Sequence, residues 1–431
     1  MKKALILSYY WPPGSGPGVQ RWLKFCKYLP EFDWEPIVIT VKNGSYPSKD
    51  ESLLNDVPDD LKVYRTNSIE PFVLYNMLRG KKGKSVEVAM ASVKGKQSRF
   101  ARFANYIRSN YFIPDARVGW NAYSYPQALK LIKKYNPDVI VTTGPPHSTH
   151  LVGERIHKQT GLPWVADFRD PWTTIYYNQF LLRTEKSTQK DAQLETSVVS
   201  TASSMLVATP GMMEEFKDRA RNISFIPNGF DEDDFENLQP EANTSFTLAY
   251  VGNLKPVQNV KTLWQAIREL IDENESFKQH FKLAITGNVA QEVLEEIKRN
   301  ELDEWVSIRP FVPHKESISR MLAAHALLLP IPEDPNNKVI LTGKLFEYLA
   351  TQRPILSIGP TDGNASDILN ACNKEAMIAY DDKETMKSVL LSLLAQYQQD
   401  ANPVTTGNDH YKTYSRKGTT SSLAKLFEEL C

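Results

Sequence analysis

The apolar and polar positions of the chain alternate between short apolar runs and helical spacing from the first residues onward. Short apolar runs bounded by turn residues predict strands, and apolar residues at i, i+3 and i+4 predict helices. In the first half we expect a helix at Gln20–Leu29 and strands at Ala4–Tyr9, Pro36–Val41, Asp138–Thr142, Trp164–Asp167 and Ser204–Ala208. This alternation predicts a parallel, doubly wound sheet with its ligand site at the carboxyl ends of the strands.

The pattern pauses near residue 226, at Ile-Pro-Asn-Gly-Phe-Asp, and then restarts. Residues 342–356 predict a loop, a helix and a buried strand, and a turn-rich stretch at 400–408 precedes a helix at Ser421–Leu430. The other elements expected in this half are Phe246–Val251, Leu263–Ile271, Lys282–Thr286, Val289–Arg299, Val306–Pro310 and Ala326–Ile331. The simplest division is therefore two α/β units joined near residue 230.

Length and composition exclude several classes of protein. A chain of 431 residues is long enough for two or three domains with cores of their own. The 51 basic and 51 acidic residues balance, so the total charge gives no argument for nucleic-acid binding. Three scattered cysteines form neither a disulfide framework nor a metal cluster, which favours a reducing compartment. The first apolar run stops at Ser8, and no apolar run is long enough for a membrane span, so we expect a cytoplasmic protein, at most peripheral to a membrane.

Residues 342–356 contain the most informative polar side chains. Thr342 is a candidate N-cap, and Gly343 lets the backbone pass close to a ligand. Lys344 and the N–H groups of the first helical turn form a positive pocket that suits a phosphate. We expect Glu347 on that same turn, where its carboxylate can accept two hydrogen bonds from a ribose diol. The alternative is an amphipathic helix whose lysine and glutamate are simply solvated.

This segment resembles the nucleotide-sugar-binding helix of retaining glycosyltransferases of family 4, of the type that makes bacterial surface polysaccharides. The resemblance implies the GT-B architecture, in which two Rossmann-like doubly wound domains face each other across a cleft and a C-terminal helix packs back on the first domain. It also implies that Glu347 holds the ribose of the donor. The family has a second glutamate eight residues earlier, where this chain has Val339.

Two other segments strengthen the resemblance, and the first of them lies at the expected domain boundary. Residues 226–231 are close to the family's interdomain turn, Pro-Asn-Gly-(apolar)-Asp, and residues 323–330 resemble the strand before the donor loop. An Asn-Gly turn is common in itself, so the evidence is its position near residue 226, where the strand and helix pattern pauses. The expected domains are an acceptor-binding domain at 1–228, a nucleotide-sugar-binding domain at 229–412, and a returning helix at 413–431.

The glycine-rich loop after the first strand favours a nucleotide sugar over a dinucleotide. Glycines between a strand and a helix can bind NAD, but Val19 stands where that fingerprint has its third glycine. The second strand also ends without the acidic residue that holds an adenine ribose. A flexible glycine turn is the alternative. The loop resembles the family's Gly-Gly-x-x-Arg opening, which implies that Gly18 and Arg21, supported by Gly16, face the donor phosphates and the acceptor.

Residues 250–259 occupy the place of the family's phosphate clamp but depart from it. Asn253 stands where the family has arginine, and Gln258 stands where it has lysine. A diphosphate needs cationic or N–H partners, which Lys255 and Lys344 can supply. If they do not, the chain binds the donor weakly or is a degenerate relative that binds without turnover.

Residues 143–150 and 165–172 are the expected chemical centre, because they follow two predicted parallel strands. The Asp-Phe-Arg-Asp-Pro-Trp segment resembles a subgroup of the family, which implies Asp170 nearest the anomeric carbon and Arg169 positioning it or binding an acceptor anion. Asp167 orients the loop in this interpretation, and His147 belongs to the same site. The alternatives are a structural Asp–Arg lattice and a polar helix start at His147.

The histidines of this region do not form a recognisable metal site. His150 and His157 are seven residues apart on a predicted helix, and His147 precedes that helix. No Cys or close carboxylate set completes a site, and no Asp-x-Asp motif follows a strand. We expect no cofactor and no metal requirement.

The expected reaction transfers a sugar from a UDP- or GDP-linked donor to a hydroxyl of a glycan or lipid-linked acceptor, with retention of configuration. Cations and helix N–H groups would stabilise the departing diphosphate. In the front-face mechanism attributed to the family, the leaving phosphate deprotonates the acceptor. A sugar-nucleotide epimerase of the same fold is an alternative, although we identify no motif with its active-site carboxylates and histidine.

A basic insertion at about 79–111 bears on the acceptor. Residues 79–102 contain eight basic residues against one acidic residue, with aromatic residues interleaved and following. This composition suits an anionic membrane surface or a lipid diphosphate. A solvated loop is the alternative.

Overall fold

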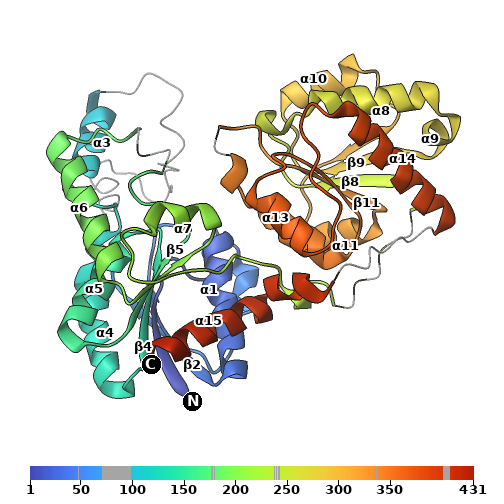
Figure 1. Ribbon diagram of the computed structural model, residues 1–431. Coiled ribbons are helices and arrows are strands. Elements are labelled where there is room, and N and C mark those ends of the chain that lie inside the picture. Colours follow the sequence, from blue (N-terminus) through green and yellow to red (C-terminus); the bar gives the residue numbers. More distant parts are fainter. Residues whose placement is uncertain are drawn as a thin grey trace. The chain divides into compact units, whose positions relative to one another are not determined.

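The structure is a computed structural model of the chain, and it describes residues 1–46, 48–69, 99–175, 178, 180–236, 238, 240, 243–335, 337–400 and 408–431. Two compact units make up the fold (Figure 1). Unit 1 comprises Met1–Asn228 and Thr419–Cys431, and unit 2 comprises Gly229–Gly418. The basic residues at 79–98, part of the expected insertion, lie outside the described ranges.

Unit 1 contains a seven-stranded parallel sheet in the order β3-β2-β1-β4-β5-β6-β7. The chain order reverses between β1 and β4, which makes this the switch point of the sheet. The strands are β1 Lys2–Leu7, β2 Trp34–Val41, β3 Lys62–Thr66, β4 Val139–Gly144, β5 Trp164–Phe168, β6 Ser204–Val207 and β7 Ile223–Phe225.

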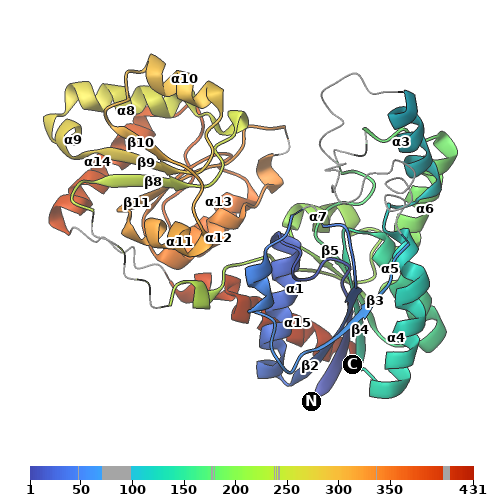
Figure 2. The same ribbon diagram turned by 180° about the vertical axis from the view of Figure 1, so that it is seen from behind.

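Helices cover both faces of this sheet (Figures 1 and 2). The α-helices are α1 Pro17–Tyr28, α3 Arg99–Tyr111, α4 Asn121–Tyr135, α5 Ser148–Thr160, α6 Glu185–Thr201, α7 Pro210–Phe216 and α15 Arg416–Leu430. Short 3-10 helices are η1 Leu29–Phe32, η2 Glu51–Leu54 and η3 Val118–Trp120.

The core of unit 1 follows the two-residue period of its strands. On β1, Ala4 and Ile6 pack in a cluster with residues of α1 and α15. Leu5 and Leu7 pack on the other face with residues of α4, α5 and α6. A strand with buried side chains on both faces reads in sequence as a continuous apolar run, which is why β1 could be predicted.

The C-terminal helix α15 belongs to unit 1, which confirms that part of the predicted fold. The ring of Phe427 lies 5.0 Å from that of Trp34. Lys2 and Glu428 form an ion pair of 2.6 Å beside the two chain ends. The helix begins at Arg416 rather than at the expected Ser421. Ser415 supplies the reason, because its hydroxyl accepts a hydrogen bond from the Gly418 N–H at 3.0 Å and so starts the helix earlier.

Unit 2 contains a five-stranded parallel sheet in the order β10-β9-β8-β11-β12, with its switch point between β8 and β11. The strands are β8 Thr247–Val251, β9 Lys282–Thr286, β10 Val306–Arg309, β11 Ala326–Pro330 and β12 Ile355–Ile358. The α-helices are α8 Lys261–Glu273, α9 Glu275–His280, α10 Gln291–Arg299, α11 His314–Ala323, α12 Gly343–Thr351, α13 Asn364–Ala371 and α14 Lys383–Gln399. The 3-10 helices are η5 Glu232–Asp234, η6 Pro256–Gln258, η7 Asn337–Val339 and η8 Asp409–Tyr414.

In both sheets, the switch point therefore lies at loops that the sequence analysis predicted to bind a ligand. In doubly wound sheets, ligands bind outside the carboxyl ends of the strands at the switch point. In unit 1 these ends carry the glycine loop after β1 and residues 145–150 after β4. In unit 2 they carry residues 252–258 after β8 and the loop from β11 to α12. Among the described residues, no helix has the length and apolarity that a membrane crossing requires.

Candidate active site

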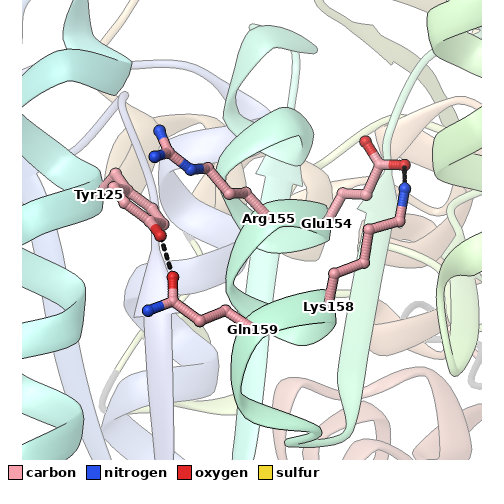
Figure 3. A pocket seen from close by; sticks show the side chains of 5 residues that line it. All are labelled: Tyr125, Glu154, Arg155, Lys158 and Gln159. Atoms are coloured by element: carbon pink, nitrogen blue, oxygen red, sulfur yellow. Dashed lines mark hydrogen bonds and ion pairs between the residues drawn. The ribbon is translucent and has the colours of Figure 1, made fainter.

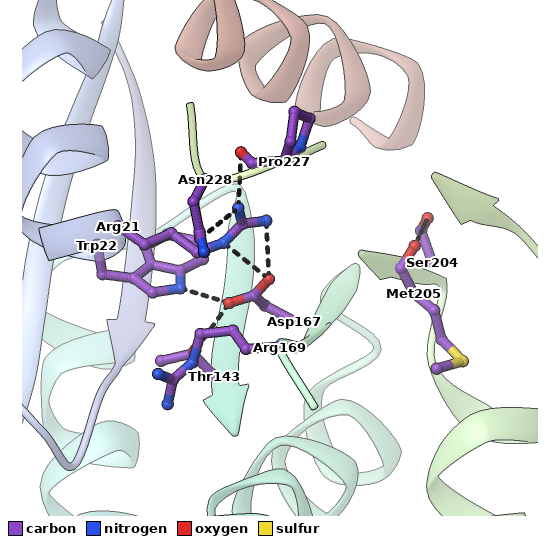
Figure 4. A network of polar contacts seen from close by, with 9 residues as sticks. All are labelled: Arg21, Trp22, Thr143, Asp167, Arg169, Ser204, Met205, Pro227 and Asn228. Carbon is purple, nitrogen blue, oxygen red and sulfur yellow. Dashed lines mark hydrogen bonds and ion pairs between the residues drawn. The ribbon is translucent and has the colours of Figure 1, made fainter. Parts of the chain in front are cut away.

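A buried ion pair lies at the centre of the unit 1 site (Figure 4). Arg21 on α1 and Asp167 on β5 are both fully buried. The Arg21 guanidinium donates to Asp167 Oδ1 from Nε at 3.2 Å and from Nη2 at 3.1 Å. Its Nη1 donates to the Pro227 carbonyl at 2.9 Å. Arg21 is thus enclosed in this structure and ties α1 to Pro227, near the end of the first segment of unit 1. The sequence prediction placed it facing the donor phosphates and the acceptor.

Asp167 has a full set of hydrogen-bond donors. Besides the two from Arg21, its Oδ2 accepts from Trp22 Nε1 at 2.6 Å and from Thr143 Oγ1 at 2.7 Å. A carboxylate can only accept hydrogen bonds, and these donors occupy both of its oxygens. These contacts fix the orientation of the Asp167 carboxylate, and its role in capping or orienting the loop stays a prediction.

Arg169 lies between β4 and the glycine loop. Its Nε donates to Thr143 Oγ1 at 3.1 Å, and its Nη2 donates to the Pro145 carbonyl. A Cβ on Gly18 would overlap the guanidinium, so only glycine leaves room for Arg169 there. Gly16 serves a different purpose: its φ of +117° is unfavourable for other residues, whereas no described atom lies within 4 Å of the place that a Cβ would take. The structure thus brings Gly18 and Arg169 together, and Gly16 precedes Gly18 in the same loop.

His147 and His150 lie in an aromatic layer with Phe168 and Trp172. The His147 ring stacks on Trp172 with centroids 5.0 Å apart, and the His150 ring stacks on Phe168 at 4.5 Å. Burial lowers the pKa of His147 well below its ordinary value, with His150 and Arg169 contributing, and burial lowers the pKa of His150 to about 3. His147 is therefore a neutral, stacked ring.

Asp170 retains exposed surface beside this layer. Neighbouring atoms that displace water raise the pKa of its carboxyl above the ordinary value, and the Arg169 guanidinium opposes this shift. A raised pKa on an accessible carboxyl is typical of functional sites.

Two buried carboxylates of α6 hold the loop that follows Asp170. Asp191 accepts from Trp172 Nε1 at 2.9 Å, and Glu195 accepts from the Thr173 N–H and hydroxyl at 2.8 Å. This pair was not predicted from the sequence. A spacing of four residues places both on one helical face, but only the fold shows that this face meets the loop.

In unit 2, Lys344 lies across the end of β8. Its Nζ is 5.2 Å from the centroid of the Tyr250 ring, and a Cβ on Gly252 would overlap the end of the lysine side chain. Burial lowers the pKa of Lys344, which Glu347 opposes and Lys255 reinforces. A cation held beside an aromatic face and partly desolvated interacts more strongly with an incoming anion.

The helix that carries Lys344 begins as predicted at its first residues. Thr342 occupies the N-cap position of α12, but its side chain makes no capping hydrogen bond. In the part of the chain that the structure describes, its buried hydroxyl has no hydrogen-bond partner. Gly343 is exposed, and no described atom lies within 4 Å of the position that a Cβ would take. These features leave a polar, open helix N-terminus.

Glu347 is the fifth residue of α12 and therefore lies on the second turn of the helix. The sequence prediction placed it on the first turn. Thr342 is the extended N-cap, with φ −93° and ψ 147°, so the helix begins at Gly343 and its first turn ends before Glu347. The side chain is half-buried, and burial raises the pKa of its carboxyl. His314 is the largest opposing influence, whereas Asp234 adds to the rise.

The loop after β8 contains a buried residue, Gln258, and two exposed residues, Asn253 and Lys255. Gln258 is buried; its Nε2 donates to the Pro330 carbonyl at 2.9 Å, and its Oε1 accepts from the Lys255 N–H at 3.3 Å. It thereby joins the ends of β8 and β11. Asn253 and Lys255 are exposed, and Asn253 accepts the Tyr250 hydroxyl at its backbone carbonyl. Residue 258 is a lysine in the resembled family, whereas in this chain Gln258 holds the ends of β8 and β11 together.

An open surface depression of about 420 Å³ lies elsewhere, between α4 and α5 (Figure 3). The side chains that line it are paired with each other. Glu154 bonds Lys158 at 2.6 Å, the Arg155 guanidinium covers the Tyr125 ring at 3.8 Å, and the Tyr125 hydroxyl bonds Gln159. It lies on helix surfaces and not at strand ends, so we do not assign the chemistry to it. Within the described residues, no group of three or more His, Cys, Asp or Glu side chains is arranged to hold a metal ion.

Comparison with known proteins shows the fold. No protein-family model matches the chain, and no curated protein matches it in sequence. Among solved structures, sucrose-phosphate synthase from Thermosynechococcus elongatus is similar with a TM-score of 0.58 at 12% identity, covering 100% of this chain and 99% of the other. A variant of S. aureus TarM, in complex with fondaparinux, α-GlcNAc-glycerol and UDP, gives 0.52 at 10% identity, covering 100% and 98%.

WaaG, a glycosyltransferase involved in lipopolysaccharide biosynthesis, gives a TM-score of 0.50 at 15% identity, covering 98% of this chain and 99% of the other. Identities this low establish architecture and leave the reaction to be argued from the site. The two parallel-sheet α/β units and the returning C-terminal helix confirm the predicted fold class: the chain has the GT-B fold.

Proposed function

We propose that the protein is a retaining glycosyltransferase that moves a sugar from a nucleoside-diphosphate donor to a hydroxyl of a glycan or lipid-linked acceptor. UDP is bound by the similar TarM variant, and WaaG is itself a glycosyltransferase. Surface-polysaccharide synthesis is the role that the sequence resemblance favours.

The observation that carries the proposal is the group of side chains at the switch point of unit 2. Lys344, held on Tyr250, presents a cation beside the N-terminus of α12. The unpartnered Thr342 hydroxyl, among described residues, and the open space over Gly343 adjoin it. Helix N–H groups together with a cation suit a diphosphate. Glu347, one turn further along, provides the carboxylate for a ribose diol.

In the proposed reaction the glycosidic bond to the diphosphate breaks as the acceptor hydroxyl attacks from the same face. Negative charge grows on the leaving phosphate, where Lys344, Lys255 and the α12 N–H groups would stabilise it. The departing phosphate oxygen accepts the proton of the acceptor hydroxyl, so no separate base is needed. Asp170 lies nearest the anomeric carbon, and Arg169 orients it or holds an acceptor anion. We propose no metal requirement, since these cations stand where a metal would otherwise neutralise charge.

Calorimetry with UDP and GDP tests the donor site. We expect binding of one nucleotide by the wild type and its loss in both Lys344→Gln and Glu347→Ala. Unchanged affinity in both variants would remove the basis of the proposal. Release of nucleotide from a panel of UDP- and GDP-linked hexoses then tests catalysis, where Asp170→Asn should lose turnover and keep binding.

A non-catalytic nucleotide-sugar-binding protein is the second candidate, and the loop after β8 favours it. Gln258 and the exposed Asn253 replace the lysine and arginine of the resembled clamp. Val339, 42% exposed, stands where the family has its first glutamate. Nucleotide binding without turnover by the wild type, on the full donor panel, would support this candidate.

The acceptor side of the proposal rests on unit 1. Helix α3 contains no acidic residue, and its Tyr106 and Tyr111 are 41% and 72% exposed. We propose that this region faces an anionic membrane surface or a lipid-linked acceptor. Cosedimentation with phosphatidylglycerol vesicles, compared with phosphatidylcholine vesicles, tests this: equal binding to both would contradict it.

A further inference from the structure

Thr143, a buried residue of β4, occupies a junction in the polar network of unit 1 (Figure 4). Its hydroxyl donates to Asp167 Oδ2 at 2.7 Å and accepts from Arg169 Nε at 3.1 Å. A hydroxyl has one hydrogen to donate, and a carboxylate can only accept. The proton must therefore point at Asp167, which leaves an oxygen lone pair for Arg169.

Further hydrogen bonds hold the Asp167 carboxylate, the acceptor of the Thr143 hydroxyl, in place. The carboxylate also accepts two hydrogen bonds from Arg21 and one from Trp22, and Asp167 and Arg21 are fully buried. Arg21 in turn donates to the Pro227 carbonyl. A network with every member satisfied is rigid, because any movement would leave a buried polar group unpaired. The direction of the Thr143 hydroxyl is therefore set by groups outside the reacting site.

The Arg169 end faces that site. With Nε on Thr143 and Nη2 on the Pro145 carbonyl, two of the three guanidinium nitrogens are fixed. The planar fork leaves no freedom for the third, Nη1, which lies against Gly18 at the start of α1. The next residue along the chain is Asp170. A single hydroxyl thus connects an immobile ion pair to the cation beside the candidate catalytic carboxyl.

We propose that Thr143 is a positioning residue, which transmits the orientation of the buried Arg21–Asp167 pair to Arg169 and so fixes the charge beside Asp170. This inference rests on the proposed function, in which Arg169 and Asp170 act at the transferred sugar. Thr143 itself touches neither donor nor acceptor. Its removal should therefore lower the rate of the chemical step and leave donor binding in unit 2 intact.

The test compares three variants on one strand. Thr143→Val keeps the shape and removes the hydroxyl, and Thr143→Ser restores the hydroxyl. Thr142→Val is the matched control: Thr142 is equally buried, and its hydroxyl accepts from Trp164 and bonds His150 rather than Arg169. Each variant is assayed for thermal stability, for UDP and GDP affinity, and for kcat and KM on the UDP- and GDP-linked hexose panel.

We expect kcat of Thr143→Val to fall roughly 10- to 100-fold, as for a small misplacement of a catalytic group, with the donor KM unchanged. Thr143→Ser should recover most of that loss. Thr142→Val should lose stability but keep its kcat. A kcat for Thr143→Val equal to that of Thr142→Val would overturn the proposal, as would a failure of serine to rescue.

A second readout does not depend on the reaction. Arginine labelling with phenylglyoxal, measured on the peptide that contains Arg169, reports how firmly the guanidinium is held. Labelling should be several-fold faster in Thr143→Val than in the wild type, and unchanged in Thr142→Val. If the wild type neither binds nor turns over any donor, the proposed function fails, and the labelling rate still decides the role of Thr143. Equal labelling in all variants would refute it.

Discussion

Replacement of Gly343 by alanine separates the two roles that the start of α12 can have. Gly343 is exposed and is the first residue of the helix, and no described atom lies within 4 Å of the position of a Cβ. An added methyl group therefore costs nothing sterically in the unliganded protein. If the space over Gly343 holds a diphosphate, the same methyl group must collide with the ligand.

The magnitudes follow from these contacts. A Gly→Ala change at a compatible backbone position stabilises a protein by about 0.4–1 kcal/mol, because the unfolded chain loses freedom. For a unit of this size that is a rise in Tm of about 1 to 4 °C. Displacing a phosphate from one charge-assisted hydrogen bond costs about 1.5–3 kcal/mol, which is a loss of roughly 10- to 100-fold in nucleotide affinity.

Both quantities can be measured on one preparation, by thermal unfolding and by calorimetry with UDP and GDP. The rise in Tm is the internal control, because it shows that α12 is intact. A higher Tm with an unchanged Kd would refute the placement of the diphosphate over Gly343. A lower Tm would refute the statement that this space is open.

Three further predictions concern the buried groups. Arg21→Met removes the ion-pair partner of the buried Asp167 carboxylate, so the free energy of unfolding should fall by about 3–5 kcal/mol in chemical denaturation. An unchanged denaturation midpoint would contradict the buried ion pair. Gln258→Ala should cost about 1–3 kcal/mol in the same assay, because the Pro330 carbonyl loses its donor, and a neutral result would show that this bond is replaced by water. Since burial lowers the pKa of Lys344, nucleotide affinity should decline with rising pH before the ordinary lysine value of 10.5 is reached; calorimetry on the wild type over this pH range measures the decline, and a constant affinity would contradict it.

The elements that could be predicted from sequence are those whose signal is local. Strands β1 and β9 are short apolar runs, and α12 begins with a glycine and a lysine directly after an N-cap residue. The start of α12 could be predicted, because Thr342 is the N-cap. Glu347 was nevertheless placed one turn too early, since the fifth residue after an N-cap already lies beyond the first turn of 3.6 residues.

The role of Arg21 depended on contacts that sequence does not show. An arginine after a glycine loop is equally compatible with binding a ligand phosphate and with pairing to a buried carboxylate. The choice is made by Asp167, 146 positions away in the chain. Gln258 is similar, since its partner, the Pro330 carbonyl, is 72 positions away and carries no sequence signal. Long-range partners of this kind decide which polar side chains remain available to a ligand.

In both units, a loop side chain at a position that the resemblance assigns to the phosphates makes its hydrogen bonds within the protein. In unit 1 the arginine of the glycine loop is enclosed by Asp167, and Arg169, from the end of β5, lies beside Gly18. In unit 2 the clamp position is occupied by Gln258, and the cation at the strand ends is Lys344, from the start of α12. Arg21, which is paired in the interior, cannot neutralise a ligand without breaking its own pair, and Gln258 carries no charge. The charge that a diphosphate or an anionic acceptor requires must then come from the next crossover, which is why we assign it to Arg169 and Lys344.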